Sequence, residues 1–100
     1  MKIFEGFNVY DHEYSYDEMK VMHVLAKMPN IYGLDYEDLM CIANATFNIW
    51  AGNIEDDEIF QQYPWLDFED IEEYGYIQKY AERILPKLIN LYKLEVEIND

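Results

Sequence analysis

Two nearly identical six-residue segments lie 32 positions apart in the chain, LDYEDL at residues 34–39 and LDFEDI at residues 66–71. In each segment the first aspartate fits the N-cap of a helix, and two further carboxylates follow where the helix dipole favours negative charge. The apolar residues at the two ends of each segment fit a hydrophobic staple. The pattern predicts two similarly capped helices. They belong either to two helix-loop-helix units, over residues 16–50 and 56–85, or to convergent capping without a repeat architecture.

A third helix start precedes these two. Ser15 and Glu18 have the spacing of a capping box, which predicts a helix over residues 16–27. Its polar face carries Lys20, His23 and Lys27. At 100° per residue its apolar residues fall on one broad face, which we expect to be buried. These residues are Met19, Val21, Met22, Val24, Leu25, Ala26 and Met28.

Stop signals divide the middle of the chain. Gly52 fits the end of a helix over residues 36–51, and a Tyr-Pro pair at residues 63–64 ends a short helix over residues 57–62. The longer helix has an apolar arc suited to a central position. The arc consists of Leu39, Met40, Ile42, Ala43, Phe47, Ile49 and Trp50.

A last long helix begins near residue 68, and Pro86 either kinks it or starts another helix over residues 87–93. Its outward positions are Glu72, Lys79, Glu82 and Arg83. Its inward positions are Ile71, Tyr74, Ile77, Tyr80, Ala81, Ile84 and Leu85. Alternating apolar residues at 3–10 and 94–98 are also typical of short strands, which would pair the two ends of the chain. The predicted fold is mainly α, a compact bundle of about four to five helices with helix-turn-helix-like units in one acidic domain over residues 1–100.

Charge is the strongest indication of function. The chain has 21 Asp and Glu against 7 Lys and Arg, a net charge of -14, and residues 28–78 contain no Lys or Arg. With 17% aromatic residues the chain can nevertheless bury enough surface to fold. The negative charge disfavours conventional nucleic-acid binding and binding to anionic membranes, because both depend on protein cations.

Catalytic and metal-binding patterns are absent from the sequence. The two histidines and the single cysteine, His12, His23 and Cys41, have no metal-ligand spacing and no nucleophile-base motif. We therefore expect a protein that is not an enzyme and has no cofactor or metal. Cys41 is expected to be peripheral and unreactive. Without a signal peptide or membrane span, the expected location is the cytoplasm, that of the host cell if the chain is phage-encoded.

The acidic run at residues 69–73 has a charge density close to that of DNA. Its four carboxylates in five residues place a charge every ~1.9 Å along a helix, against one per about 1.7 Å of duplex axis. This favours mimicry of a phosphate track, although capped helices with solvated acidic faces would also account for the charges. Aromatic residues beside the acidic clusters favour a protein interface, although core packing is the commoner fate of a tryptophan in such a turn. The candidate partner-binding residues are Asp35, Glu37, Asp38, Glu55, Asp56, Asp57, Glu58, Tyr63, Trp65, Asp67, Glu69, Asp70, Glu72, Glu73 and Tyr76.

Residues 52–81 carry a Gly, an EI pair at Glu58-Ile59, and then Tyr63, Pro64, Leu66, Glu69, Asp70 and Ile71 at matching spacing. This stretch resembles the small helix-turn-helix antitoxin family that accompanies PIN-domain toxins. The resemblance implies a local helix-turn-helix fold. It does not favour operator binding, because a reading helix that opens with four carboxylates would repel phosphates.

The functional hypothesis is a nucleic-acid (DNA or RNA) mimic that inhibits a basic nucleic-acid-binding enzyme or effector complex by occupying its cleft. In size, charge and aromatic content the chain is similar to small acidic phage inhibitors of the antirestriction and anti-CRISPR kind. The alternatives are an antitoxin or nuclease-immunity protein, and an acidic domain whose charge serves solubility alone. The oligomeric state stays open, with a homodimer among the options.

Overall fold

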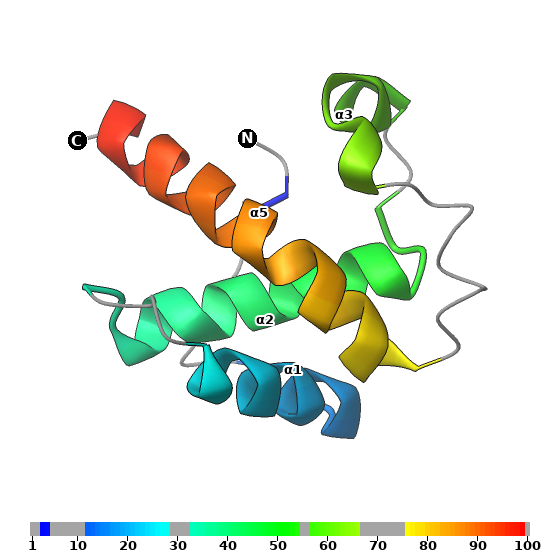
Figure 1. The fold of residues 1–100 in the computed structure, drawn as a ribbon, viewed down its shortest axis with the longest axis vertical. Coiled ribbons are helices and arrows are strands. Elements are labelled where there is room, and N and C mark those ends of the chain that lie inside the picture. The colour runs from blue at the N-terminus through cyan, green and yellow to red at the C-terminus, as the bar shows by residue number, and fades with distance from the viewer. Residues whose placement is uncertain (1–2, 5–11, 29–32, 55–56, 67–75, 100) are drawn as a thin grey trace.

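The computed structural model describes residues 3–4, 12–28, 33–54, 57–66 and 76–99. Within them lie four α-helices, α1 (Tyr16–Lys27), α2 (Tyr36–Trp50), α3 (Asp57–Gln62) and α5 (Ile77–Asn99), and a 3-10 turn at Pro64–Leu66. Helices α1, α2 and α5 all contact one another, and α3 contacts the 3-10 turn. Figure 1 shows α5 crossing α2, with α1 beside them and α3 at another edge. The mainly helical, compact fold is the one that the sequence predicts.

Helix α1 begins where the capping box predicts. The Ser15 hydroxyl accepts a hydrogen bond from the Glu18 backbone N–H (3.2 Å), and the Glu18 carboxylate accepts one from the Ser15 backbone N–H (3.2 Å). Each side chain thereby satisfies a backbone donor that the first helical turn leaves without a partner. His23 and Lys27 lie exposed on the outer side, as expected.

The apolar face predicted for α1 is too broad. Val21, Val24 and Leu25 are buried, but Met19 is 52% exposed and Ala26 is exposed as well. Helix α1 contacts both α2 and α5, and its buried side is centred on the valines and Leu25. Met19 lies well away from that centre because each residue turns the helix by 100°.

Helix α2 is capped at both ends by local interactions. The Asp35 and Asp38 side chains form a second capping box, with hydrogen bonds of 2.9 and 3.0 Å to each other's backbone N–H groups. At the other end, Gly52 adopts a φ of 76°, which favours glycine, and its N–H donates to the carbonyl of Ile49. The predicted helix over residues 36–51 is confirmed to within one residue, and α3 has the predicted bounds.

Helix α5 settles the alternatives for the C-terminal region. Pro86 lies inside one helix, so residues 87–93 do not start another. The predicted strand at residues 94–98 is wrong, because these residues continue α5. Upstream, Leu88, Ile89 and Tyr92 pack on the core at helical spacing, and five alternating residues are too few to outweigh a helix already anchored there. In the predicted N-terminal strand, Ile3 and Phe4 lie in a turn and residues 5–10 lie outside the described part.

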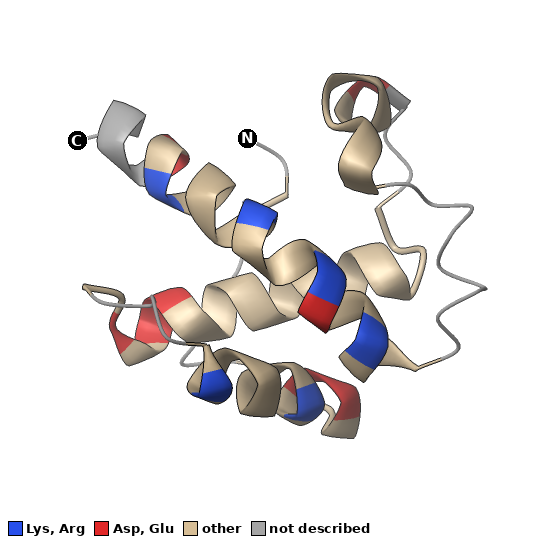
Figure 2. Cartoon of the chain, viewed as in Figure 1, with Lys and Arg blue, Asp and Glu red and all other residues tan. Residues whose placement is uncertain are grey.

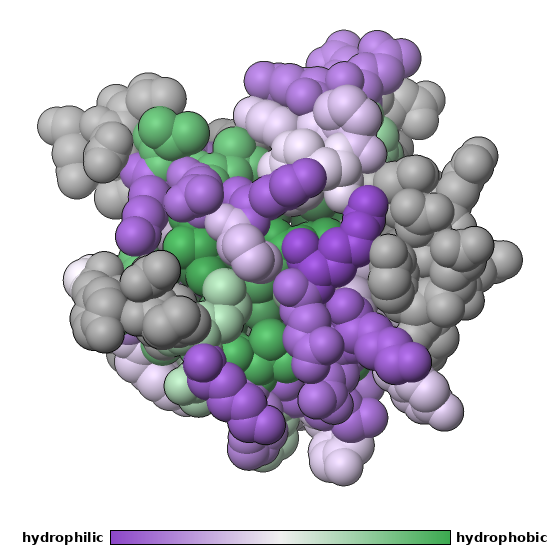
Figure 3. Space-filling model, viewed as in Figure 1, coloured by the Kyte–Doolittle hydropathy of each residue, from purple (hydrophilic) through white to green (hydrophobic). Residues whose placement is uncertain are grey.

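The core is formed by the three mutually packed helices together with Ile3, Ile59 of α3 and Leu66 of the 3-10 turn. Among the predicted inward positions of the last helix, Ile77, Tyr80, Ala81, Ile84 and Leu85 are buried, and the outward Lys79, Glu82 and Arg83 are exposed. Its predicted start near residue 68, together with Ile71, Glu72 and Tyr74, lies outside the described residues. In Figure 3 hydrophobic side chains remain visible in the middle of one face, between hydrophilic side chains.

Candidate functional site

The first acidic cluster lies at the start of α2. Asp35 and Glu37 are exposed, and Asp38 is half-buried. The Tyr92 hydroxyl of α5 donates a hydrogen bond of 2.5 Å to the Asp38 carboxylate. Burial, followed by this hydrogen bond, raises the pKa of Tyr92 above its ordinary value. Asp38 therefore joins α2 to α5, which leaves Asp35 and Glu37 as the outward-facing carboxylates of this cluster.

The second cluster lies at the start of α3. Glu58 is exposed, whereas its neighbour Ile59 is buried in the core and fixes the helix to the bundle. Glu55 and Asp56 lie outside the described residues, and Asp57 is placed only as the first residue of α3.

Aromatic residues follow α3, just before and within the 3-10 turn. The Tyr63 and Trp65 rings lie 5.8 Å apart, and both side chains pack against the core while remaining partly exposed. The Lys87 ammonium lies 5.8 Å from the centre of the Trp65 ring. Trp65 therefore packs against the core, which is the commoner role of a tryptophan in a turn between helices. Only part of its ring is exposed to solvent.

The densest acidic run, with Asp67, Glu69, Asp70, Glu72 and Glu73, lies outside the described residues. The described residues on its two sides are firmly held, because Leu66 and Ile77 are 0% and 1% exposed. Tyr76 is 68% exposed, as expected, but it lies just before α5 and not within the helix.

The described acidic clusters do not come together. The first turn of α2 and helix α3 lie at opposite ends of the molecule as drawn in Figure 2. All Lys and Arg of the described residues lie on α1 and α5, whereas α2, α3 and the 3-10 turn carry none. The separation of acidic from basic residues along the sequence is thus also a separation between helices.

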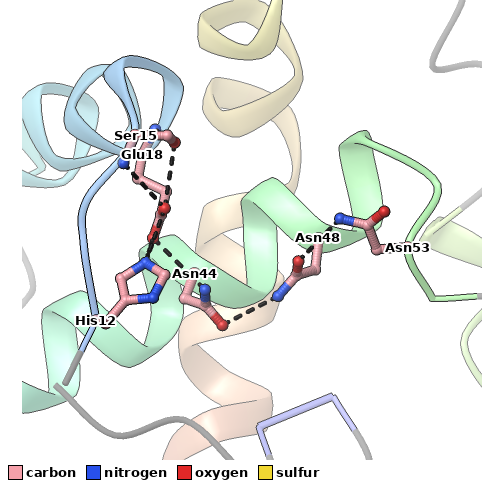
Figure 4. A network of polar contacts seen from close by, with 6 residues as sticks. All are labelled: His12, Ser15, Glu18, Asn44, Asn48 and Asn53. Atoms are coloured by element: carbon pink, nitrogen blue, oxygen red, sulfur yellow. Dashed lines mark hydrogen bonds and ion pairs between the residues drawn. The ribbon is translucent and has the colours of Figure 1, made fainter.

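A polar network that the sequence does not reveal lies between α1 and α2. Glu18 is only 1% exposed, and its carboxylate lies 2.7 and 2.9 Å from Nε2 of His12. The Ser15 hydroxyl and the Asn44 amide also donate to it, at 3.1 and 3.5 Å. Figure 4 shows how hydrogen bonds continue from Asn44 along α2 to Asn48 and Asn53. Spacing identifies the Ser15–Glu18 pair, but only the tertiary structure brings His12 and Asn44 to it.

No family model, curated protein or solved structure matches the chain. Among the described residues no group of three or more His, Cys, Asp and Glu side chains is placed to hold a metal ion. In the same part of the chain no helix has the length and apolar character needed to cross a bilayer.

Partial burial of Cys41 predicts a slowly reacting thiol. The thiol is partly buried and lies 3.9 Å from the Phe4 carbonyl. Burial, assisted by the charges of Asp38 and Glu95, raises its pKa from 9.0 to about 11. At neutral pH the thiolate fraction is therefore about 100-fold below that of an ordinary thiol. We expect an aromatic disulfide reagent to modify Cys41 at least about tenfold more slowly in the native chain than in urea. Equal rates in the two states would contradict this prediction.

Proposed function

We propose that the chain is a non-enzymatic acidic binding protein that docks its acidic segments, namely the start of α2, helix α3 and residues 67–73, on a basic protein surface. In its most concrete form it is a nucleic-acid mimic that occupies the cleft of a nucleic-acid-binding enzyme or complex. The carboxylates of these acidic segments would take the place of nucleic-acid phosphates, so they would recognise a partner whose cations are spaced to bind phosphates.

The observation that carries the proposal is the separation of charge between helices. Lys20 and Lys27 lie on α1, and the remaining described cations lie on α5, which contacts α1. The described parts of α2 and α3 therefore carry no cation that would repel a basic partner, whereas Arg83 and Lys87 of α5 lie against Trp65 of the 3-10 turn. A helix whose acidic residues served only as a solvated surface would more commonly intersperse Lys at i+4.

Exposed tyrosines beside the acidic segments support an interface. Tyr36 lies between Asp35 and Glu37 and is 61% exposed, and Tyr76 follows the acidic run and is 68% exposed. Tyrosine buries a large area at low entropic cost and is enriched at protein interfaces. The distance between the acidic clusters at α2 and α3 in Figure 2 fits an extended basic track better than one compact pocket.

Charge reversal tests the proposal. The immobilised chain is incubated with a nuclease-treated lysate from bacteria that carry nucleic-acid defence systems, and retained proteins are eluted with duplex DNA. We expect retention of basic nucleic-acid-binding proteins that DNA displaces. The variant Glu69→Lys/Glu72→Lys/Glu73→Lys should retain at least about tenfold less of them, because reversal replaces attraction by repulsion.

A matched control separates the effect of the charges in the acidic run from the effect of the net charge of the chain. Glu13, Asp17 and Glu82 lie on or next to α1 and α5 and are exposed or half-exposed. Their simultaneous replacement by lysine changes the net charge by the same amount and should leave retention nearly unchanged. Equal losses in both variants, or retention that duplex DNA does not affect, would refute the mimic.

A further inference from the structure

An apolar groove lies between α1 and the start of α2. Its volume is about 390 Å³. It is lined by Tyr14, Met19, Met22, His23, Ala26, Tyr36 and Met40. Three of the five methionines of the chain therefore lie at one surface feature.

The rim of this groove exposes large apolar side chains. Met19 is 52% exposed and Tyr36 is 61% exposed, and Tyr16 beside them is 74% exposed. Contiguous apolar surface of this kind marks interaction sites in soluble proteins. Methionine suits such a surface because its flexible thioether adapts to the shape of a partner.

The two sides of the groove carry opposite charges. On one side, Asp35 and Glu37 are exposed on either side of Tyr36 at the start of α2. On the other side, Lys20 and Lys27 are seven residues apart on α1 and so share one helix face. The Lys20 ammonium lies 4.6 Å from the centre of the Tyr16 ring and 4.0 Å from the Asp17 carboxylate, and Lys27 lines a separate hollow toward α5. The groove is thus an apolar strip between a cationic side and an anionic side.

We propose that this groove binds a second copy of the chain to form a symmetric dimer. A symmetric interface must be complementary to itself. A two-fold axis parallel to the groove places Lys20 and Lys27 of each copy opposite the first turn of α2 of the other copy. The same rotation stacks the two apolar strips and removes Met19 and Tyr36 from water.

The charges favour a second copy over a basic partner at this place. A basic partner would meet Lys20 and Lys27 beside the groove, whereas a second copy offers them carboxylates. Repulsion between two copies of net charge -14 acts at long range and is screened within about 10 Å at ordinary salt. The apolar strip is unaffected by that screening, so the dimer should persist when salt is raised. The dimer would cover Asp35, Tyr36 and Glu37, so a basic partner would then bind the remaining acidic residues. The dimer is tested without that partner, so the two proposals can fail separately.

Sedimentation equilibrium of the full chain tests the dimer. We expect the mass to rise with concentration from 12.1 kDa toward twice that value, with a dissociation constant in the micromolar range of about 1–100 µM. Met19→Glu should weaken the dimer at least about tenfold, because it places a carboxylate in the apolar strip. Met19 is half-exposed, so this change leaves the core intact.

A charge swap tests the pairing of the two sides. Lys20→Glu/Lys27→Glu should weaken the dimer, and adding Glu37→Lys to that variant should restore part of the affinity. Lys79→Glu/Lys87→Glu on the exposed face of α5 changes the net charge equally and should have the smaller effect. A chain that stays monomeric at all concentrations overturns the proposal, even if the groove binds a basic amphipathic peptide. A dimer that tolerates Met19→Glu overturns it as well.

Methyl NMR provides a readout that needs no variant. The methyl signals of Met19, Met22 and Met40 should shift with concentration over the range in which the mass rises. Met28 lines the other hollow, beside α5, and serves as the internal reference. Association without shifts at the three groove methionines would overturn the proposal.

Discussion

Replacement of Glu18 by alanine is expected to lower the free energy of unfolding by about 2–4 kcal/mol, because it removes a buried carboxylate and leaves several partly buried donors without their acceptor. The carboxylate receives hydrogen bonds from the Ser15 backbone and hydroxyl, from His12 and from Asn44, and it is 1% exposed. Since a carboxylate only accepts, Nε2 of His12 is the donor in that contact. Loss of Glu18 would therefore release the segment before α1 and loosen the contact between α1 and α2.

Urea unfolding followed by circular dichroism measures this effect. Asp17→Ala is the matched control, because Asp17 precedes Glu18 in the same first turn but is half-exposed and forms only a 4.0 Å ion pair with Lys20. We expect the control to change the stability by no more than about 0.5 kcal/mol. Similar losses for Glu18→Ala and Asp17→Ala would show that the buried network contributes little.

Replacement of Tyr80 by alanine is expected to cost about 3–5 kcal/mol of stability, because it empties the place of a large aromatic side chain in the core. Tyr80 is 0% exposed, and its hydroxyl donates a 3.5 Å hydrogen bond to the Leu66 carbonyl. This side chain joins α5 to the 3-10 turn, the described elements on either side of the densest acidic run.

The phenylalanine variant separates packing from hydrogen bonding. Tyr80→Phe keeps the ring and removes only the hydroxyl, so the expected loss is about 1 kcal/mol. The same unfolding measurement serves both variants. A loss for Tyr80→Phe as large as that for Tyr80→Ala would place the stabilisation in the hydroxyl and contradict the packing argument.

Local interactions made most of the helices predictable. The capping boxes at Ser15–Glu18 and at Asp35, and the glycine at residue 52, involve residues only a few positions apart, so their spacing is visible in the sequence. Alternation at residues 94–98 was misleading for a related reason. A pattern of five residues fits a strand as well as a helix. Residues 94–98 are helical because the preceding turns of α5 already pack against the core.

The candidate site was predictable in composition but not in arrangement. Sequence alone identifies Asp35, Glu37 and Glu58 as acidic residues near helix starts, and the structure leaves all three exposed. It does not reveal that the two described clusters lie far apart, as Figure 2 shows. Nor does it reveal that Asp38 bonds to Tyr92, 54 positions away.

The sequence by itself determined the helix starts, the mainly helical class and the separation of acidic from basic residues along the chain. These properties depend on side chains and backbone groups within one or two helical turns. The tertiary structure decided which polar groups are buried, with Asn44 reaching Glu18 across 26 positions. It also decided that Met19 and Tyr36 share an exposed groove. Such contacts depend on how α1, α2 and α5 pack against one another, and no local spacing in the sequence encodes that packing.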